Sequence, residues 1–156
     1  MSSLPIGSVA SDFSLPDQFG TVHRLRDQRG SWTLLYFYPK DDTPGCTKEA
    51  CAFRDHFPAF KKLGIKVFGV SIDPVKKHSA FVTKYKLPFL LLADVDKIVV
   101  HAYGVWQKKK FMGREYMGTM RWSFLIDPRG RIKKVYTDVK PETHAEEVLG
   151  DLKRLE

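Results

Sequence analysis

Both cysteines of the chain, Cys46 and Cys51, lie in a short segment that follows an apolar run. The run, residues 32–38, predicts a strand, and the loop after it ends in Thr43-Pro44-Gly45-Cys46. Proline suits the first helical position because it has no backbone N–H to leave unpaired, and threonine is a competent N-cap. We therefore expect a helix that begins at Pro44 and carries Cys46 in its first turn.

A cysteine in the first turn of a helix is placed for nucleophilic chemistry. Unpaired backbone N–H groups and the positive end of the helix dipole stabilise an anion there, and the thiolate is the reactive form of cysteine. A thiol with a pKa near 8.5 is only about 3% ionised at pH 7, whereas a pKa near 6 gives about 90% ionisation. Asp41 and Asp42 stand close by in the sequence and oppose ionisation. We therefore expect a permanent cation beside Cys46.

The spacing of the two cysteines argues against a static disulfide. On one ideal helix, five residues advance about 7.5 Å and turn about 140°, which places the two Cα atoms roughly 8–9 Å apart. A disulfide tolerates at most about 7 Å. Cys46 and Cys51 could therefore pair only after the helix unwinds locally. Two alternatives stay open: a structural disulfide, and two unreactive core thiols. The second suits Cys51 better, because a helix N-terminus beneath a Pro-Gly loop is usually accessible.

The motif Pro39-x-x-x-Thr43-x-x-Cys46 resembles the active-site motif of the peroxiredoxins. Cys51, five residues later, makes the pair similar to that of the bacterioferritin-comigratory, or peroxiredoxin Q, branch. Residues 121–127, Arg-Trp-Ser-Phe-Leu-Ile-Asp, resemble the family segment in which an arginine precedes a Ser/Thr and a Phe on a strand. The resemblance covers nearly the whole chain, from about Phe13 to the final helix.

The resemblance implies roles for three further residues. It assigns Arg121 to stabilising the thiolate and holding the peroxide, the Thr43 hydroxyl to hydrogen bonding at the peroxide, and Pro39 to shielding the pocket from water. Taken alone, these residues have plainer interpretations: a surface arginine, an N-cap and a proline that ends a strand. Glu49 either orients Arg121 or is simply a good helix residue. No metal, flavin or haem cofactor is implied.

The function that the resemblance implies is that of a thiol peroxidase. The Cys46 thiolate would attack hydrogen peroxide or an organic hydroperoxide and become a sulfenic acid. Cys51 would resolve it as an intramolecular disulfide, and thioredoxin, the expected dithiol donor, would restore both thiols. Two other classes remain open. A disulfide oxidoreductase would share the fold, but four residues rather than two separate the cysteines. A redox sensor or binding module would need only the oxidisable pair.

Length and composition indicate one compact domain, residues 1–156, because 43% hydrophobic content is ample for a core at this length. The N-terminus has neither a basic start nor a continuous apolar run, and no segment approaches about 20 apolar residues. We therefore expect no export signal and no membrane span. Two cysteines in such a chain point to a reducing compartment, the cytoplasm. By resemblance we expect a monomer.

The charge balance is basic, with 26 Lys and Arg against 18 Asp and Glu, and it invites a nucleic-acid hypothesis. Short lysine runs such as Lys108-Lys109-Lys110 are interspersed with apolar residues, and no basic motif of a nucleic-acid fold occurs. We therefore interpret the lysines as solvated faces and expect neither a nucleic-acid nor a membrane partner.

The elements needed to position these residues alternate between strand and helix patterns. We predict an α/β, thioredoxin-like fold: a central mixed sheet flanked by helices, preceded by an N-terminal β-hairpin. The expected strands are 13–15, 22–25, 31–38, 65–72, 89–93, 121–127 and 131–136, and the expected helices are 44–63, 73–85, 97–103 and 141–155. Residues 106–118 are expected to form a surface loop, or, as the less favoured alternative, a wall of the substrate pocket.

Overall fold

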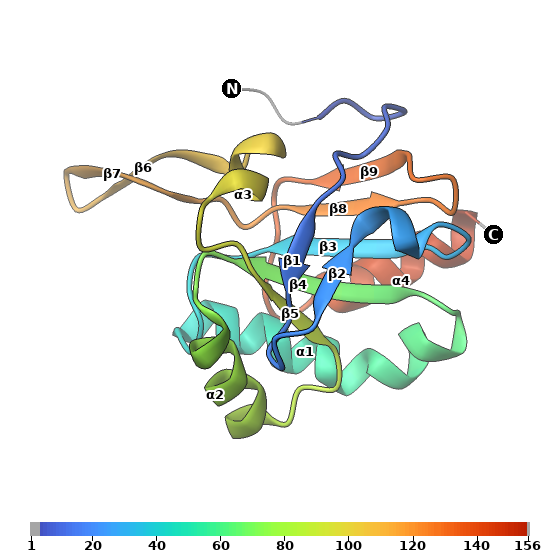
Figure 1. Ribbon diagram of the computed structural model, residues 1–156, viewed down its shortest axis with the longest axis horizontal. Coiled ribbons are helices and arrows are strands. Elements are labelled where there is room, and N and C mark those ends of the chain that lie inside the picture. The colour runs from blue at the N-terminus through green and yellow to red at the C-terminus, as the bar shows by residue number, and fades with distance from the viewer. Residues whose placement is uncertain (1–3, 156) are drawn as a thin grey trace.

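The computed structural model describes residues 4–155 and contains a five-stranded mixed sheet (Figure 1). The strand order is β5-β4-β3-β8-β9. The first three of these strands are parallel, whereas β8 runs antiparallel to β3 and β9 antiparallel to β8. The bounds are β3 (Thr33–Phe37), β4 (Lys66–Ser71), β5 (Leu90–Ala93), β8 (Ser123–Ile126) and β9 (Ile132–Tyr136).

Helices cover both faces of this sheet. One face carries α1 (Pro44–Lys62), α2 (Val75–Tyr85) and α4 (His144–Leu155). The other carries α3 (Ile98–Ala102) and the N-terminal hairpin of β1 (Ser14–Pro16) and β2 (Val22–Arg24), which leads into a short 3-10 helix, η1 (Leu25–Gln28). Every residue of β3 is buried, as expected of a central strand with both faces covered.

Alternation along β3 divides the core into two clusters. Leu34 and Tyr36 pack on the α1 side, whereas Leu35 and Phe37 pack on the α3 side. Because β3 lies at the centre of the sheet and leads directly into the loop before α1, its carboxyl end is a rigid platform for the cysteine segment.

The predicted α/β, thioredoxin-like arrangement is confirmed, including the mixed sheet and the N-terminal hairpin. The elements expected outside residues 106–118 are present, with ends that differ by a few residues. Two placements differ locally: Leu25 opens η1 instead of ending β2, and Arg121 lies two residues before β8 instead of on it.

The prediction of a loop at residues 106–118 is wrong. The segment forms a hairpin of β6 (Trp106–Phe111) and β7 (Arg114–Thr119), which projects from the body of the molecule at the left of Figure 1. Its tight turn holds Met112 and Gly113, with φ values of 51° and 79°. The sequence hid it for two reasons. Both faces of the ribbon are largely polar, so no alternation appears, and methionine stands where such turns usually carry Asn, Asp or Gly.

Within residues 4–155, no helix combines the length and apolar character that crossing a membrane requires. The expectation that no export signal is present concerns a segment that begins with residues 1–3, which lie outside the described part of the chain.

Candidate active site

The chain reaches Cys46 through a tight loop at the end of β3. Asp42 in this loop has a left-handed backbone, with φ 56°, and Thr43 returns to an extended conformation at the N-cap. The helix then begins with Pro44 in its first turn, as predicted, and the Thr47 N–H donates to the Thr43 carbonyl at 2.8 Å. Cys46 is therefore the third residue of α1.

Thr43 does not cap the helix with its side chain, contrary to the prediction. Its Oγ1 donates to the Lys40 carbonyl oxygen at 2.9 Å, because the tight loop brings that acceptor next to it. The Gly45 and Cys46 N–H groups therefore receive no cap from Thr43 and stay available to an anion above the first turn. Pro39 is half-buried two residues beyond β3, a place compatible with both of its suggested roles.

Arg121 meets Cys46 although 75 residues separate them in the sequence. Its Nη2 lies 3.5 Å from the Cys46 Sγ, and its Nη1 donates to the Glu49 Oε1 at 2.8 Å. The Phe37 N–H donates to the Trp122 carbonyl at 2.8 Å, which ties the segment of Arg121 to the end of β3. Burial by itself would lower the pKa of Arg121, but the negative charges of Cys46 and Glu49 outweigh it and raise that pKa. The guanidinium is thus a permanent cation at the sulfur.

Glu49 holds Arg121 from inside the protein. It follows Cys46 by three residues, which places both side chains on one face of α1. Its side chain is fully buried, and its second oxygen, Oε2, has no hydrogen-bond partner among the described residues. Burial raises the pKa of Glu49 to about 7, against the opposing pull of Arg121. Of the two sequence interpretations, the contacts favour orientation of Arg121 over simple helix propensity.

Gly45 also lies in the candidate site, which its place in the sequence did not lead us to expect. A Cβ atom on Gly45 would lie 2.9 Å from the Arg121 Nη2, so only glycine leaves room for the guanidinium in this position. The available signal was a glycine within a predicted helix, because glycine costs about 1 kcal/mol relative to alanine in a helix interior.

The burial of the two cysteines is the reverse of the expectation. Cys46 is only 2% exposed, whereas Cys51 is half-buried. Cys46 belongs to the core cluster that also contains Tyr36 and Tyr38, at the end of β3. Both thiols are free, so a structural disulfide is not present. Burial raises the pKa of the Cys51 thiol, and Arg54 opposes this rise only in part. Burial therefore keeps Cys51 in the neutral thiol form.

The two carboxylates expected to oppose a thiolate have partners of their own. Asp41 is buried, accepts a hydrogen bond from the Tyr38 hydroxyl at 2.5 Å and pairs with the His78 Nδ1 at 2.6 Å. Asp42 pairs with the Lys84 Nζ at 2.8 Å, and hydrogen bonds led by that of Lys84 lower the pKa of Asp42. The sequence shows two adjacent carboxylates without a partner for either, whereas in the fold helix α2 supplies a partner to each.

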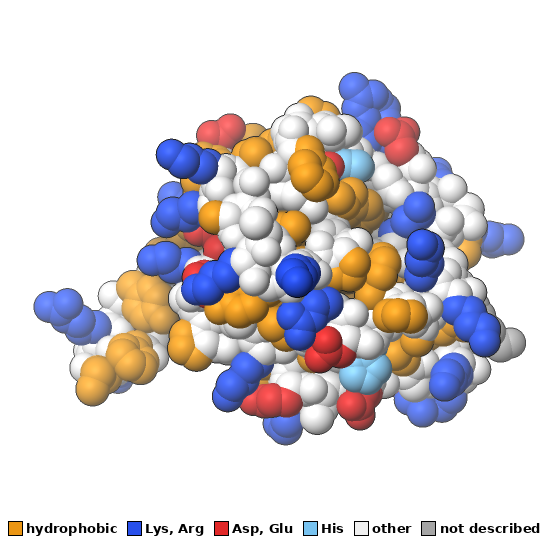
Figure 2. All heavy atoms as spheres, turned by 90° about the horizontal axis from the view of Figure 1, so that it is seen from below, with side chains coloured by type: hydrophobic (Ala, Val, Ile, Leu, Met, Phe, Trp, Pro, Cys, Tyr) orange, Lys and Arg blue, Asp and Glu red, His pale blue; other side chains and the backbone are white. Residues whose placement is uncertain are grey.

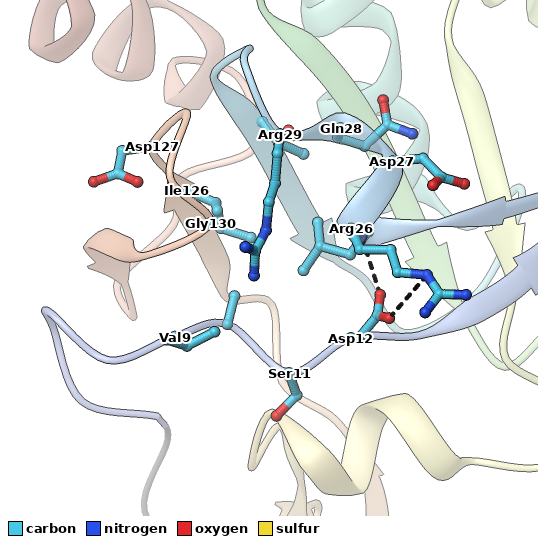
Figure 3. A pocket seen from close by; sticks show the side chains of 13 residues that line it. Val9, Ser11, Asp12, Arg26, Asp27, Gln28, Arg29, Ile126, Asp127 and Gly130 are labelled. Carbon is cyan, nitrogen blue, oxygen red and sulfur yellow. Dashed lines mark hydrogen bonds and ion pairs between the residues drawn. The ribbon is translucent and has the colours of Figure 1, made fainter.

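A cavity of about 670 Å³ lies elsewhere, beside the first residue of β3 (Figure 3). Arg26 pairs with Asp12 at its edge, and the Arg29 side chain extends across it toward Gly130. None of the predicted site residues lines it. Cys46 follows the opposite, carboxyl end of β3, so this cavity is separate from the candidate site around the buried sulfur.

The fold and the site together define a thioredoxin-like protein with a buried cysteine in the first turn of α1 and an arginine in contact with its sulfur. The model of the AhpC/TSA family matches residues 6–135. The chain therefore belongs to this family, the peroxiredoxins, and its relatives place it in the bacterioferritin-comigratory, or peroxiredoxin Q, branch.

Two curated relatives are similar over almost their whole length. Peroxiredoxin Bcp of Escherichia coli K12 is 47% identical over 153 residues, 98% of either chain. Peroxiredoxin Bcp of Bacillus subtilis is 46% identical over 151 residues, 97% of this chain and 96% of that one.

Solved structures agree with this placement. A mutant of peroxiredoxin Q from Xylella fastidiosa superposes with a TM-score of 0.94 at 36% identity and 99% coverage of both chains. The bacterioferritin comigratory protein of Xanthomonas campestris, studied for its alkyl peroxide reduction activity, gives 0.89 at 37% identity and 99% coverage of both.

The expectation of a thiol peroxidase is thereby confirmed. The protein is an oxidoreductase, a thiol-dependent peroxidase. The alternatives of a disulfide oxidoreductase and of a redox sensor without turnover are set aside.

Proposed function

We propose that Cys46 is the thiol that attacks the peroxide. Its thiolate attacks one oxygen of the substrate ROOH, the O–O bond breaks, and a sulfenic acid, Cys46–SOH, forms. The leaving RO⁻ takes up one proton and departs as water or an alcohol. This proton balances the one that the thiol loses when it ionises, so the step consumes no other reactant.

The observation that carries the proposal is the position of Arg121. Its guanidinium lies 3.5 Å from the Cys46 Sγ and is held from the other side by Glu49. A fixed positive charge in a largely water-excluded place stabilises the thiolate and also the negative charge that develops on the leaving oxygen. The uncapped N–H groups of the first turn of α1 support the same charges.

We further propose that Cys51 resolves the sulfenic acid. Its sulfur attacks Cys46–SOH, and a disulfide and one water molecule form. Both residues lie on the continuous helix α1, so the step requires the first turns to unwind. Thioredoxin then reduces the disulfide by two successive exchanges and regenerates both thiols. Thr43 and Pro39 complete the proposed pocket as hydrogen-bonding and water-shielding residues.

The remaining expectations form part of the same proposal: the chain acts as one domain, as a monomer, in the cytoplasm, where a dithiol donor is kept reduced. No nucleic-acid partner is proposed. Figure 2 supports this view, because on the face that it displays the Lys and Arg side chains are scattered and do not gather in one stripe.

The test is a pair of cysteine variants assayed with hydrogen peroxide, thioredoxin and thioredoxin reductase. Cys46→Ser should show no turnover, because a hydroxyl cannot supply the thiolate. Cys51→Ser should reduce one equivalent of peroxide in a single turnover and then stall, unless an external thiol is added. Full steady-state activity of Cys51→Ser with thioredoxin would exclude its resolving role, and activity of Cys46→Ser would exclude the proposed nucleophile.

A further inference from the structure

Lys109 differs from the two lysines beside it. Along β6 successive side chains point to opposite faces, and Lys108 and Lys110 are exposed whereas Lys109 is half-buried. Its Nζ donates to the Thr119 carbonyl oxygen at 2.9 Å, at the end of β7 next to the body of the protein. The interpretation of this lysine run as a solvated face is therefore wrong for Lys109.

The path of this side chain depends on Gly118. A Cβ atom on Gly118 would lie 2.9 Å from the Lys109 Cδ, so the lysine stem passes directly over the glycine on its way to Thr119. The backbone of Gly118 lies outside the left-handed region, so conformation alone does not demand glycine there. The close approach of the lysine does.

The ammonium of Lys109 lies within the electrostatic field of the proposed active site. Thr119, which holds it, is two residues before Arg121. The pKa of Lys109 is lowered, first by burial and then by the positive charge of Arg121, while the charge of Cys46 acts in the opposite direction. Arg121 thus contacts the Cys46 sulfur directly, whereas Lys109 is held at the Thr119 end of β7 and acts on the same sulfur through its charge alone.

We propose that Lys109 is a positioning residue of the peroxidase centre: its ammonium anchors the segment that carries Arg121 and adds a second positive charge to the surroundings of the Cys46 thiolate. The inference rests on the proposed role of Cys46 and extends it to the β6–β7 hairpin. Other charged or titratable groups that face this pair are Glu49 of α1, which accepts a hydrogen bond from Arg121, Tyr36 of β3, and Tyr116 of β7, which lies opposite Lys109 in the hairpin. Burial raises the pKa of Tyr36, so its hydroxyl stays un-ionised.

The test compares Lys109→Met, which keeps the stem and removes the charge, with Lys109→Arg, which keeps a charge. In Lys109→Met the midpoint of the Cys46 thiolate titration, followed by ultraviolet absorbance in a Cys51→Ser background, should rise by about half a pH unit or more. The single-turnover rate with hydrogen peroxide should fall about three- to tenfold near pH 7, and a smaller deficit should persist at a pH where the thiol is fully ionised. Lys109→Arg should keep most of the parent enzyme's titration midpoint and most of its single-turnover rate.

Lys108→Met is the matched control, because it removes a charge from the neighbouring, exposed position of the same strand. It should leave the titration and the rate unchanged. Gly118→Ala should displace the lysine stem and act in the same direction as Lys109→Met, and the double variant should be no worse than Lys109→Met alone.

A thiolate titration and a pH–rate profile of Lys109→Met that match those of the parent enzyme would overturn the proposal, even if thermal stability fell. An equal effect of Lys108→Met on the titration and the rate would also overturn it, because the effect would then depend on the net charge of the hairpin and not on the position of Lys109. Absence of peroxide turnover in the unmodified protein would instead refute the proposed function itself, so the two failures are distinguishable.

Discussion

Gly45 lies directly under the Arg121 guanidinium: a Cβ atom at Gly45 would be 2.9 Å from the Arg121 Nη2, the nitrogen that faces the Cys46 sulfur. The nearest obstacle is the far end of a flexible side chain, so an added methyl group would shift Arg121 and leave the helix intact. A substitution at position 45 can therefore change the geometry of the proposed site without weakening the first turn of the helix.

Gly45→Ala should slow peroxide reduction while the fold keeps or gains stability. Displacement of the guanidinium by about 1 Å can cost up to about 100-fold in rate, and Arg121→Ala gives the limit for its complete loss. Alanine favours a helix over glycine by up to about 1 kcal/mol. Single-turnover kinetics and urea unfolding of the same preparation measure the two effects.

Gly150→Ala in α4 is the control for this prediction. Its nearest neighbour would be the Arg154 Nη1 at an ordinary contact distance of 3.8 Å. It should therefore raise the unfolding free energy without a change in rate. A Gly45→Ala enzyme with the parent rate would show that Arg121 needs no such close approach.

The buried Glu49 should make stability depend on pH. Its pKa rises from 4.5 to about 7 on folding, so between these values the native state holds a proton that the unfolded chain has lost. The free energy of unfolding should therefore fall as the pH rises through this window, by at most about 1.4 kcal/mol per pH unit and by about 3 kcal/mol in all. Urea unfolding from pH 4 to pH 8 measures the slope.

Glu49→Gln removes this titration, and its unfolding free energy should lack that part of the slope. Glu142→Gln, at an exposed position, should keep it. Parallel stability curves for the parent and Glu49→Gln would mean that Glu49 stays ionised throughout the range, paired with Arg121.

The local parts of the site could be predicted from the sequence, whereas its long-range parts could not. Thr43, Pro44 and Cys46 stand within one turn of helix, and the start of α1 follows from the backbone chemistry of those residue types. The contact between Cys46 and Arg121 depends on the pairing of β3 with β8, which no local pattern encodes. The family resemblance suggested this contact, and spacing alone did not.

The contacts of Gly45 and Lys109 could not be predicted for the same reason. Glycine in a first turn and lysine in a basic run have ordinary local explanations, and each acquires its meaning only from a side chain that arrives from elsewhere in the chain. The hairpin that presents Lys109 was itself hidden, because a ribbon with two largely polar faces leaves no hydrophobic alternation to detect.

Oxidation should unwind the first turns of α1. Cys46 and Cys51 lie on this continuous helix, where five residues place two Cα atoms roughly 8–9 Å apart, beyond the limit of about 7 Å for a disulfide. Amide hydrogen exchange in residues 43–53 should therefore be much faster in the disulfide form than in the reduced protein, while β4 stays protected in both. Unwinding would also withdraw Cys46 from Arg121 and expose the disulfide to its reductant.

Cys51→Ser treated with one equivalent of peroxide is the control, because it forms the sulfenic acid but cannot close the disulfide. It should keep the slow exchange of the reduced helix, since oxidation alone imposes no change of Cα distance. Equal protection of residues 43–53 in the reduced and disulfide forms would mean that the two cysteines do not share a continuous helix in solution, and the resolving mechanism proposed for Cys51 would then be wrong.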